Sequence, residues 1–217
     1  MDKFSKFKKT LENALIQSNR DYEEVTVIAV SKRKSIEEIK PIMDAGHIDF
    51  GENKIQELEK KWPILKKNNH DVKIHYLGSI QSKKTKQIFE QCDFIHSIDR
   101  LKIVSIIKDL ELETKIQKEY FVQINTGDEE QKSGVKINEA EKFINECLEK
   151  YHFKISGLMC LPPINDKPEK HFNILRGIAK NFKIPHLSMG MSNDFEIALK
   201  CGATHIRVGT LIFGERN

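Results

Sequence analysis

The sequence predicts an α/β fold in which eight parallel strands close into a (β/α)8 barrel of the TIM type. Short apolar segments, each long enough for one buried strand, alternate with longer amphipathic helical patterns along the chain. No composition break and no linker rich in Pro or Gly divides the 217 residues. We therefore expect one barrel domain over residues 1–217. A doubly wound open sheet is the competing architecture.

The first elements follow from two different periodicities. Residues 3–18 place apolar side chains on one helical face, which predicts an extra N-terminal helix before the first strand. The continuous β-branched run Val25–Val30 is typical of a strand that is buried on both faces. Ser35, followed by two glutamates, predicts the N-cap of a second helix that runs to about Gly46.

The same alternation continues to the end of the sequence. Seven further strands are predicted at Ile48–Phe50, Ile74–Leu77, Phe94–Ile98, Tyr120–Ile124, Ile155–Met159, His186–Leu187 and His205–Val208. Helices are predicted between them at Asn53–Lys67, Gln81–Gln91, Arg100–Leu112, Asn138–Tyr151, Pro168–Asn181 and Asn193–Cys201.

Composition excludes several classes of protein. The 36 Lys and Arg residues are interspersed with 32 Asp and Glu residues, and the net charge is +4. The basic residues therefore form no basic arm of the kind that is typical of a nucleic-acid binder. No apolar run approaches the roughly 20 residues that cross a membrane, and the amino terminus lacks a signal peptide's apolar block. We therefore expect a cytoplasmic protein without membrane contact. The four cysteines have no C-x-x-C spacing, which predicts buried thiols and no metal cluster.

Small residues follow the last two predicted strands, where barrel proteins commonly bind phosphate. Ser188, Gly190 and Ser192 allow the backbone to approach an anion, and Gly209 and Thr210 supply a second turn of small residues. The pattern predicts a phosphorylated ligand. Taken alone, the same residue types also mark ordinary turns.

Lys32 directly follows Ala29–Ser31 at the end of the first strand, so its amine is expected to point into the mouth of the barrel. A desolvated amine loses its proton more readily and can attack an aldehyde to form a Schiff base. The alternative is a solvated surface lysine, the usual state of this residue. A reactive lysine beside a phosphate site suggests a phosphorylated aldehyde, either a sugar phosphate or pyridoxal 5′-phosphate (PLP).

Arg207 favours PLP over a sugar phosphate. It lies within the eighth strand, two residues before Gly209, so it should share the barrel interior with the ligand. An inward arginine can donate a hydrogen bond to the pyridine nitrogen and keep that nitrogen unprotonated. A pairing of Arg207 with a nearby carboxylate is the alternative.

Two further features have ordinary explanations beside functional ones. His75 and His96 have no partner at metal-ligand spacing, so hydrogen-bonded histidines at strand ends are favoured over ligands or bases. The long acidic segment 127–134 could be a lid over the site or a solvated loop.

Taken together, these motifs resemble the PLP homeostasis proteins, the YggS/PROSC group, which share the barrel of the alanine racemase N-terminal domain. The matching segments run through nearly the whole chain: Ala29–Lys32, Phe50–Asn53, His75–Gly78 with Gln81, His96–Ser97 with Asp99–Arg100, Gln123–Asn125 with Lys132–Gly134, Gly157–Met159, Leu187–Ser192 with Asp194, and Arg207–Thr210 with Phe213–Gly214. One departure is that the family usually has a proline shortly after Ser-Lys, where this chain has Arg33 and Lys34.

The resemblance implies a specific cofactor site, with PLP bound to Lys32 as a Schiff base. It implies phosphate contacts from Ser188, Gly209 and Thr210, helped by the backbone of residues 189–192. It also places Arg207 at the pyridine nitrogen and Asn53 close to the ring. The complete implied set is Lys32, Asn53, Ser188, Met189, Gly190, Ser192, Arg207, Gly209 and Thr210.

The resemblance also implies a function: a monomeric carrier or regulator of PLP, with apo PLP-dependent enzymes as possible recipients. A PLP-dependent racemase or lyase is the alternative, and a Schiff-base aldolase is a third candidate. Alanine racemases take their second base, a tyrosine, from a β-rich domain of the partner subunit. Only seven residues follow Thr210 here, which leaves no room for that domain, so we expect no racemisation at an enzymatic rate.

Overall fold

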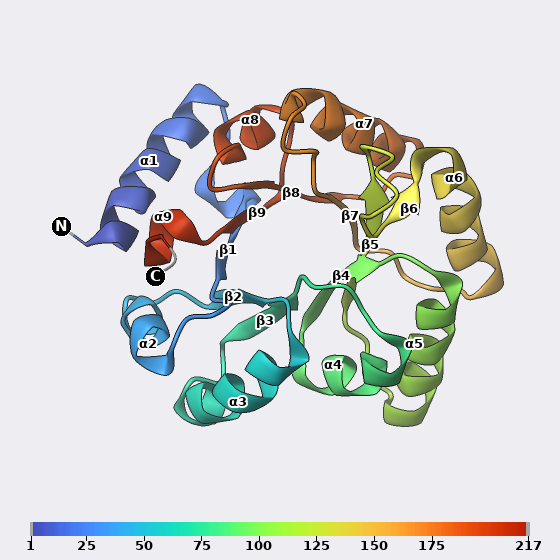
Figure 1. Cartoon of the computed structure of the whole chain (residues 1–217), viewed down its shortest axis with the longest axis horizontal. Helices are drawn as coiled ribbons and strands as arrows, with labels where there is room; N and C mark the ends of the chain where they lie inside the picture. Colours follow the sequence, from blue (N-terminus) through green and yellow to red (C-terminus); the bar gives the residue numbers. More distant parts are fainter. Residues whose placement is uncertain (1, 216–217) are drawn as a thin grey trace.

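Strands and helices alternate along the chain in the computed structural model, which describes residues 2–215 apart from the side chain of residue 68. Eight parallel strands form a ring with helices around it (Figure 1). They are β1 (Thr26–Val30), β2 (Asp49–Glu52), β3 (Lys73–Tyr76), β4 (Phe94–Ile98), β5 (Glu119–Asn125), β7 (Gly157–Cys160), β8 (His186–Met191) and β9 (His205–Val208).

The ring is closed by the pairing of β1 with two neighbours. Val27 lies opposite Ile206 of β9, and Ala29 lies opposite Phe50 of β2. The β4–β5 and β5–β7 pairings complete the circle. This closure confirms the predicted barrel and excludes the open sheet, in which two edge strands would lack a neighbour.

Six of the eight strands differ from the prediction at one or both ends, and three of them differ by two or more residues. The second strand runs from Asp49 to Glu52, the strand predicted over 155–159 begins at Gly157, and the strand at His186 continues to Met191. A two-residue strand, β6 (Val135–Lys136), also pairs with the end of β5. It was not predicted because two residues carry no periodicity.

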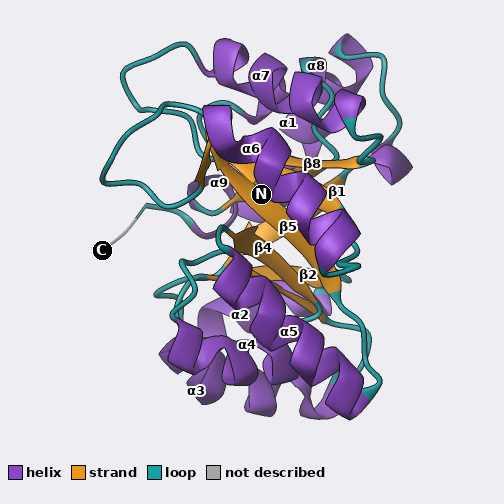
Figure 2. Cartoon of the chain, turned by 90° about the vertical axis from the view of Figure 1, so that its right-hand side faces the viewer, coloured by secondary structure: helices purple, strands orange, loops and turns teal. Residues whose placement is uncertain are grey.

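The helices lie outside the ring, as the side view in Figure 2 shows. They are α1 (Lys3–Gln17), α2 (Ile36–Asp44), α3 (Ile55–Leu65), α4 (Thr85–Gln91), α5 (Leu101–Thr114), α6 (Ile137–Asn145), α7 (Pro168–Asn181), α8 (Phe195–Lys200) and α9 (Thr210–Phe213). A π-helical turn, Glu146–Lys150, follows α6, where one continuous helix was predicted.

The extra N-terminal helix is confirmed, and it packs against the end of the chain. In Figure 1, α1 lies beside α8 and α9. The rings of Phe7 and Phe195 meet edge to face, with their centroids 5.7 Å apart. The short helix α9 was not predicted. Ser35 caps α2 as expected, since its hydroxyl accepts the Glu38 backbone N–H and the Glu38 carboxylate accepts that of Ser35.

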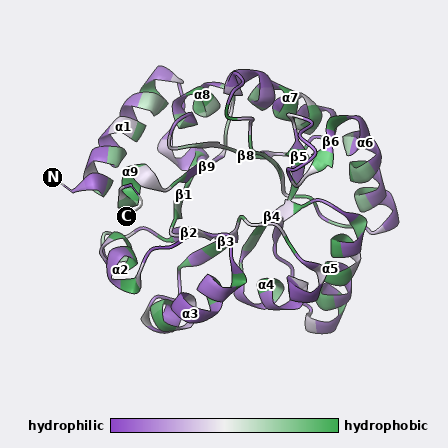
Figure 3. Ribbon diagram, viewed as in Figure 1, coloured by the Kyte–Doolittle hydropathy of each residue, from purple (hydrophilic) through white to green (hydrophobic). Residues whose placement is uncertain are grey.

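The hydrophobic core lies between the ring and its helices. The helices carry both hydrophilic and hydrophobic residues (Figure 3), and most of their apolar side chains are buried, although Ile16, Ile64 and Leu112 are exposed. Cys92, Cys147, Cys160 and Cys201 are all buried free thiols, as predicted. Burial raises the pKa of Cys147 and Cys160 to about 12, so these two are unreactive thiols at neutral pH.

The part of the chain that the structure describes contains neither a membrane-spanning helix nor a cluster of metal-binding side chains. No helix there has the length and apolar character needed to cross a membrane. Likewise, residues 2–215 contain no group of three or more His, Cys, Asp or Glu side chains placed to hold a metal ion.

Candidate functional site

A cavity of about 510 Å³ opens beside the carboxyl ends of the barrel strands. Parallel strands bring the residues that follow them to one face, so segments distant in sequence meet there. The lining residues are Val30, Lys32, Lys34, Asn53, Leu77, Met159, Leu161, Met191, Ser192, Asn193, Arg207, Gly209, Thr210, Gly214 and Glu215. Six of the nine predicted site residues are therefore brought together: Lys32, Asn53, Ser192, Arg207, Gly209 and Thr210.

Lys32 stands in the turn after β1 and is partly buried. The preceding residue, Ser31, is fully buried and donates its backbone N–H to the Gly51 carbonyl at 3.0 Å. Arg33 takes the left-handed conformation with φ of 61°, and its N–H donates to the Glu57 carboxylate at 2.5 Å. This contact holds the turn that follows β1.

A buried polar network lies behind this turn and ties β1, β2 and α3 together. One oxygen of Glu52 accepts the Ser31 hydroxyl at 2.7 Å and the indole N–H of Trp62 at 3.3 Å. The same oxygen lies 2.6 Å from Lys61 Nζ, and Lys61 also donates to the Ser31 carbonyl at 2.9 Å. Burial raises the pKa of Glu52, and the Lys61 ammonium opposes that rise. The network fixes the backbone that carries Lys32.

Arg207 reaches the cavity from β9, although only 4% of the residue is exposed. Its Nη1 donates to the Ser188 hydroxyl and its Nη2 to the Cys160 carbonyl, both at 2.8 Å. Burial lowers its pKa from the usual arginine value. Among the described residues no carboxylate lies within 4.0 Å of the guanidinium, so the alternative of an ion pair is wrong.

Ser192, Gly209 and Thr210 form one polar side of the cavity. They follow β8 and β9, and the Gly209 N–H donates to the Ser192 hydroxyl at 3.3 Å. A Cβ on Gly209 would lie 3.4 Å from the Val30 carbonyl oxygen, so the backbone runs close to β1 here. Hydroxyl and backbone N–H groups of this kind are common phosphate partners.

The other three predicted residues lie elsewhere. Ser188 and Met189 are fully buried inside β8, and neither they nor Gly190 belongs to the residues that line the cavity. Gly190 has φ of 91°, and a Cβ there would meet the Ala198 methyl at 2.5 Å. The glycine therefore has a packing role, since it allows α8 to approach β8 closely.

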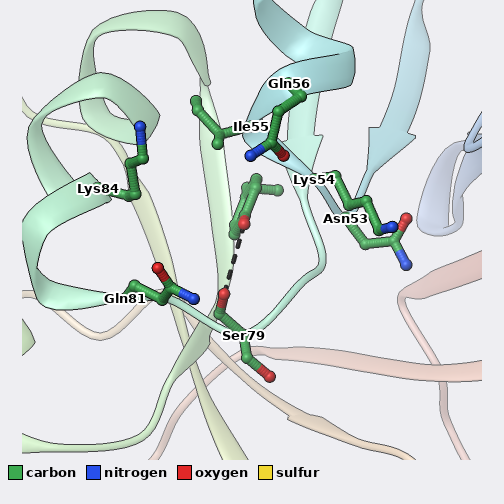
Figure 4. A pocket seen from close by; sticks show the side chains of 8 residues that line it. Asn53, Lys54, Ile55, Gln56, Ser79, Gln81 and Lys84 are labelled. Atoms are coloured by element: carbon green, nitrogen blue, oxygen red, sulfur yellow. Dashed lines mark hydrogen bonds between the residues drawn. The ribbon is translucent and has the colours of Figure 1, made fainter.

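Asn53 lines this cavity and also a second one of about 500 Å³, which Figure 4 shows from close by. The second cavity is lined by Asn53, Lys54, Ile55, Gln56, Tyr76, Ser79, Gln81 and Lys84. The Tyr76 hydroxyl donates to the Ser79 carbonyl at 3.4 Å, the dashed line in Figure 4. Burial raises the pKa of Tyr76 to about 12, so the phenol stays protonated at neutral pH.

Sequence reasoning missed several lining residues. Leu77, Met159 and Leu161 form an apolar side of the cavity, and each lies at or just after a strand end. Their positions near the carboxyl ends of strands could have identified them as lining residues. An apolar residue at such a position is, however, usually interpreted as part of the hydrophobic core. Lys34 brings a second ammonium group to the cavity, and it forms an ion pair with Glu38 at 3.0 Å.

The segment 127–134 is bonded to the barrel in this structure. The Ser133 hydroxyl lies 2.7 Å from the Ser79 hydroxyl, and the Ser133 carbonyl accepts the Gln123 amide at 2.8 Å. Lys132 pairs with Glu129 at 2.5 Å within the segment. These contacts hold the segment against the loop that follows β3.

The family model described as "Alanine racemase, N-terminal domain" matches residues 12–217. The pyridoxal phosphate homeostasis protein of Aquifex aeolicus is 33% identical to this chain over 224 residues, covering 99% of this chain and 97% of that protein. The Haemophilus influenzae protein of the same name is 34% identical, covering 95% of this chain and 92% of that protein.

A solved structure shows the same architecture. PipY of Synechococcus elongatus, with PLP bound, superposes with a TM-score of 0.81 and 29% sequence identity. The match covers 93% of this chain and 97% of PipY.

Proposed function

The chain belongs to the pyridoxal phosphate homeostasis protein family, and from that premise we propose that it binds PLP in the cavity of about 510 Å³ and holds it covalently on Lys32. The observation that carries the proposal is the meeting of Lys32 and Arg207 in one cavity. Lys32 follows β1 and Arg207 lies in the adjacent strand β9, and Ser192, Gly209 and Thr210, which follow β8 and β9, line the same cavity.

Lys32 supplies the nucleophile. A lysine amine and the PLP aldehyde condense to a Schiff base with release of one water molecule, and hydrolysis reverses the reaction. A reversible covalent bond suits a protein that takes up and releases a reactive aldehyde. PLP itself, when bound, supplies an electron-withdrawing ring that can stabilise a neighbouring carbanion.

Arg207 fits the pyridine nitrogen of this ligand. A guanidinium has five N–H donors, and the protein uses two of them, on Ser188 and Cys160. A buried cation that also faces the cavity is suited to a neutral acceptor such as a pyridine nitrogen. An arginine there keeps the ring nitrogen unprotonated, which favours holding the cofactor over using it as an electron sink.

The phosphate is assigned to Ser192, Gly209 and Thr210, with Asn53 on the side of the ring. Their support is that all four line the cavity. Ser188, Met189 and Gly190 are assigned a place behind this surface, because the first two are fully buried and the third packs against α8. Direct contact between Ser188 and the phosphate, which the family resemblance implies, has little support in this geometry, because Ser188 does not line the cavity and its hydroxyl accepts from Arg207.

The proposed role is intracellular PLP homeostasis as a carrier or regulator in the cytoplasm. Residues 1–217 would act as one PLP-binding domain and as a monomer, and apo PLP-dependent enzymes would be recipients. The support is the family membership and the donor set of the cavity.

The purified protein tests the covalent site directly. Incubated with PLP, it should turn yellow and lose the visible absorbance on treatment with borohydride, which reduces the Schiff base to a stable amine. Peptide mapping should then find the pyridoxyl group on the peptide that contains Lys32. A label on a different lysine, or no label at all, would contradict the proposal.

A further inference from the structure

A chain of hydrogen bonds runs through the barrel interior beneath the cavity. It begins at Arg207, whose Nη1 lies 2.8 Å from the Ser188 hydroxyl oxygen. Ser188 lies 3.0 Å from His96 Nδ1, and His96 Nε2 lies 3.0 Å from His75 Nδ1. The last link joins His75 Nε2 to a carboxylate oxygen of Asp49 at 2.9 Å. Five side chains from five strands are thereby joined in one line.

This line crosses the barrel from one end to the other. Asp49 is the first residue of β2, and its side chain is 18% exposed at the amino end of that strand. Arg207 is near the carboxyl end of β9, where the cavity opens. The three side chains between them are fully buried. The chain therefore connects the far face of the barrel with the proposed cofactor site.

Only one direction of donation satisfies every atom when Asp49 is ionised and both imidazole rings are neutral. A carboxylate accepts, so His75 donates from Nε2 and leaves Nδ1 as an acceptor. His96 must then donate from Nε2, which leaves its own Nδ1 to accept the Ser188 hydroxyl proton. The Ser188 oxygen in turn accepts from Arg207, which can only donate. Both histidines are neutral in this arrangement and carry their proton on Nε2.

Packing and burial support this state. His75 stacks on Phe94, and His96 stacks on Phe121, each with ring centroids 4.1 Å apart. Stacking fixes the ring planes, and so the directions of the N–H bonds. Burial lowers the pKa of His75 and holds the pKa of His96 well below its ordinary value, and positive charge on Arg207 adds to the shift at His96.

We propose that Asp49, His75, His96 and Ser188 are positioning residues that orient the Arg207 guanidinium toward the cofactor ring through this one-way hydrogen-bond chain. Arg207 has no ion pair among the described residues, and its two hydrogen bonds, to the Ser188 hydroxyl and the Cys160 carbonyl, hold its orientation. Without the chain, the Ser188 proton has no fixed acceptor and the guanidinium loses one of its two anchors. The ring contact rests on the proposed function, whereas the chain itself exists without a ligand.

The first measurement therefore uses the protein without PLP. Long-range 1H–15N correlation spectra report which ring nitrogen of a histidine carries the proton. Between pH 6 and 8 we expect His75 and His96 to be neutral and protonated on Nε2. The Asp49→Ala variant should change the state of His96, one residue beyond its direct contact, and Asp49→Asn should not, because the amide oxygen still accepts. An Nδ1-protonated or charged ring on either histidine in the unchanged protein would overturn the proposal.

The second measurement compares two ligands. Ser188→Ala should weaken PLP and pyridoxal by the same factor, about tenfold, as expected for one lost hydrogen bond to a charged group. It should also shift the visible absorption band of the bound cofactor. Asp49→Ala should shift the band in the same direction, and Asp49→Asn should restore the original position. A larger loss for PLP than for pyridoxal would make Ser188 a phosphate ligand and would contradict the positioning role.

The two proposals fail in different ways. If the unchanged protein binds no PLP, the proposed function is wrong, and the tautomers of the apoprotein still decide the hydrogen-bond chain. If PLP binds on Lys32 but its spectrum and affinity are the same in Asp49→Ala and Ser188→Ala, the positioning role is wrong and the function stands.

Discussion

The ammonium group of Lys61 lies 2.6 Å from the carboxylate of Glu52, and both side chains are buried. Neither residue lines the proposed cofactor site. Lys61 nevertheless donates to the backbone carbonyl of Ser31, the residue before Lys32. Oε2 of Glu52 has no hydrogen-bond partner within the described part of the chain. The buried carboxylate is therefore stabilised only by the contacts of Oε1 with Ser31, Trp62 and Lys61 among the described residues. The turn that carries Lys32 is thus anchored by a buried ion pair.

Lys61→Met should destabilise the protein by about 3 to 5 kcal/mol, because it leaves the Glu52 carboxylate buried without its cation. Urea unfolding would measure the loss. The double variant with Glu52→Gln should recover much of it, since that change removes the stranded charge. A loss below about 1 kcal/mol for Lys61→Met would mean that the pair has little part in the fold.

Lys32→Ala should abolish the visible Schiff-base absorbance while the unfolding midpoint stays close to that of the unchanged protein. A partly buried lysine at the mouth of a barrel contributes little to core packing, so the fold does not depend on it. Lys34→Ala is the matched control, since this second lysine also lines the cavity. If the absorbance survives in the first variant and disappears in the second, Lys34 is the anchor.

Thr210→Val should weaken PLP about tenfold more than it weakens pyridoxal, because only the phosphorylated form gains charge-assisted hydrogen bonds at this position. Valine keeps the shape of threonine and removes the hydroxyl alone. The affinities of both ligands would be measured by fluorescence titration. Equal losses for the two ligands would place the phosphate elsewhere in the cavity.

The barrel and two residues of the site, Lys32 and Arg207, could be predicted from local sequence patterns. Lys32 could be assigned because a residue that directly follows a buried strand must emerge at the strand's carboxyl end. Arg207 could be assigned because it lies within the last strand, two residues before Gly209, and was therefore expected to face the same barrel interior as the ligand. Depth within the barrel is not a local property, however. The sequence therefore did not distinguish Ser192, in the cavity, from Ser188, beneath it.

Contacts between distant elements account for what else was missed. The pairing of Glu52 with Lys61 requires α3 to pack on β2. The hydrophobic periodicity of a helix or of a strand describes one element only and does not indicate how two elements pack together. The sequence correctly favoured hydrogen-bonded histidines at 75 and 96. It could not indicate that the two rings bond to each other, because this depends on the stagger between β3 and β4.

His205→Phe should make the stability of the protein less dependent on pH. Burial lowers the pKa of His205 to about 2, whereas an unfolded histidine titrates near 6.5. The unfolded chain therefore takes up a proton as the pH falls below about 6.5, and the folded chain does not, so stability is lost in that range. Between pH 6 and 5 this residue should account for about 1 kcal/mol of the slope per pH unit.

Urea unfolding of both proteins at pH 5, 6 and 7 would measure this slope. Phenylalanine retains the ring that packs against Phe121 at a centroid distance of 5.0 Å. His70→Gln, at an exposed position, serves as the control for the loss of a histidine that is not buried. An unaltered slope in His205→Phe would mean that the ring accepts a proton in the folded state.

The protein should not racemise alanine at an enzymatic rate, even with PLP bound. Racemisation needs two groups that exchange protons on opposite faces of the substrate's α-carbon, and under the proposed function Lys32 would supply one of them. Tyr76 is a poor second group, since it lines the neighbouring cavity, donates to the Ser79 carbonyl and has a pKa raised by burial to about 12. The loss of one positioned acid or base lowers a rate by a factor of about 100 to 10,000. Arg207 at the ring nitrogen would lower it further, because an unprotonated pyridine stabilises a carbanion less well. The measurement is exchange of the α-proton of L-alanine in deuterated water, followed by NMR. Exchange with turnover by the holo-protein that disappears in Lys32→Ala would establish an enzyme and overturn the carrier role.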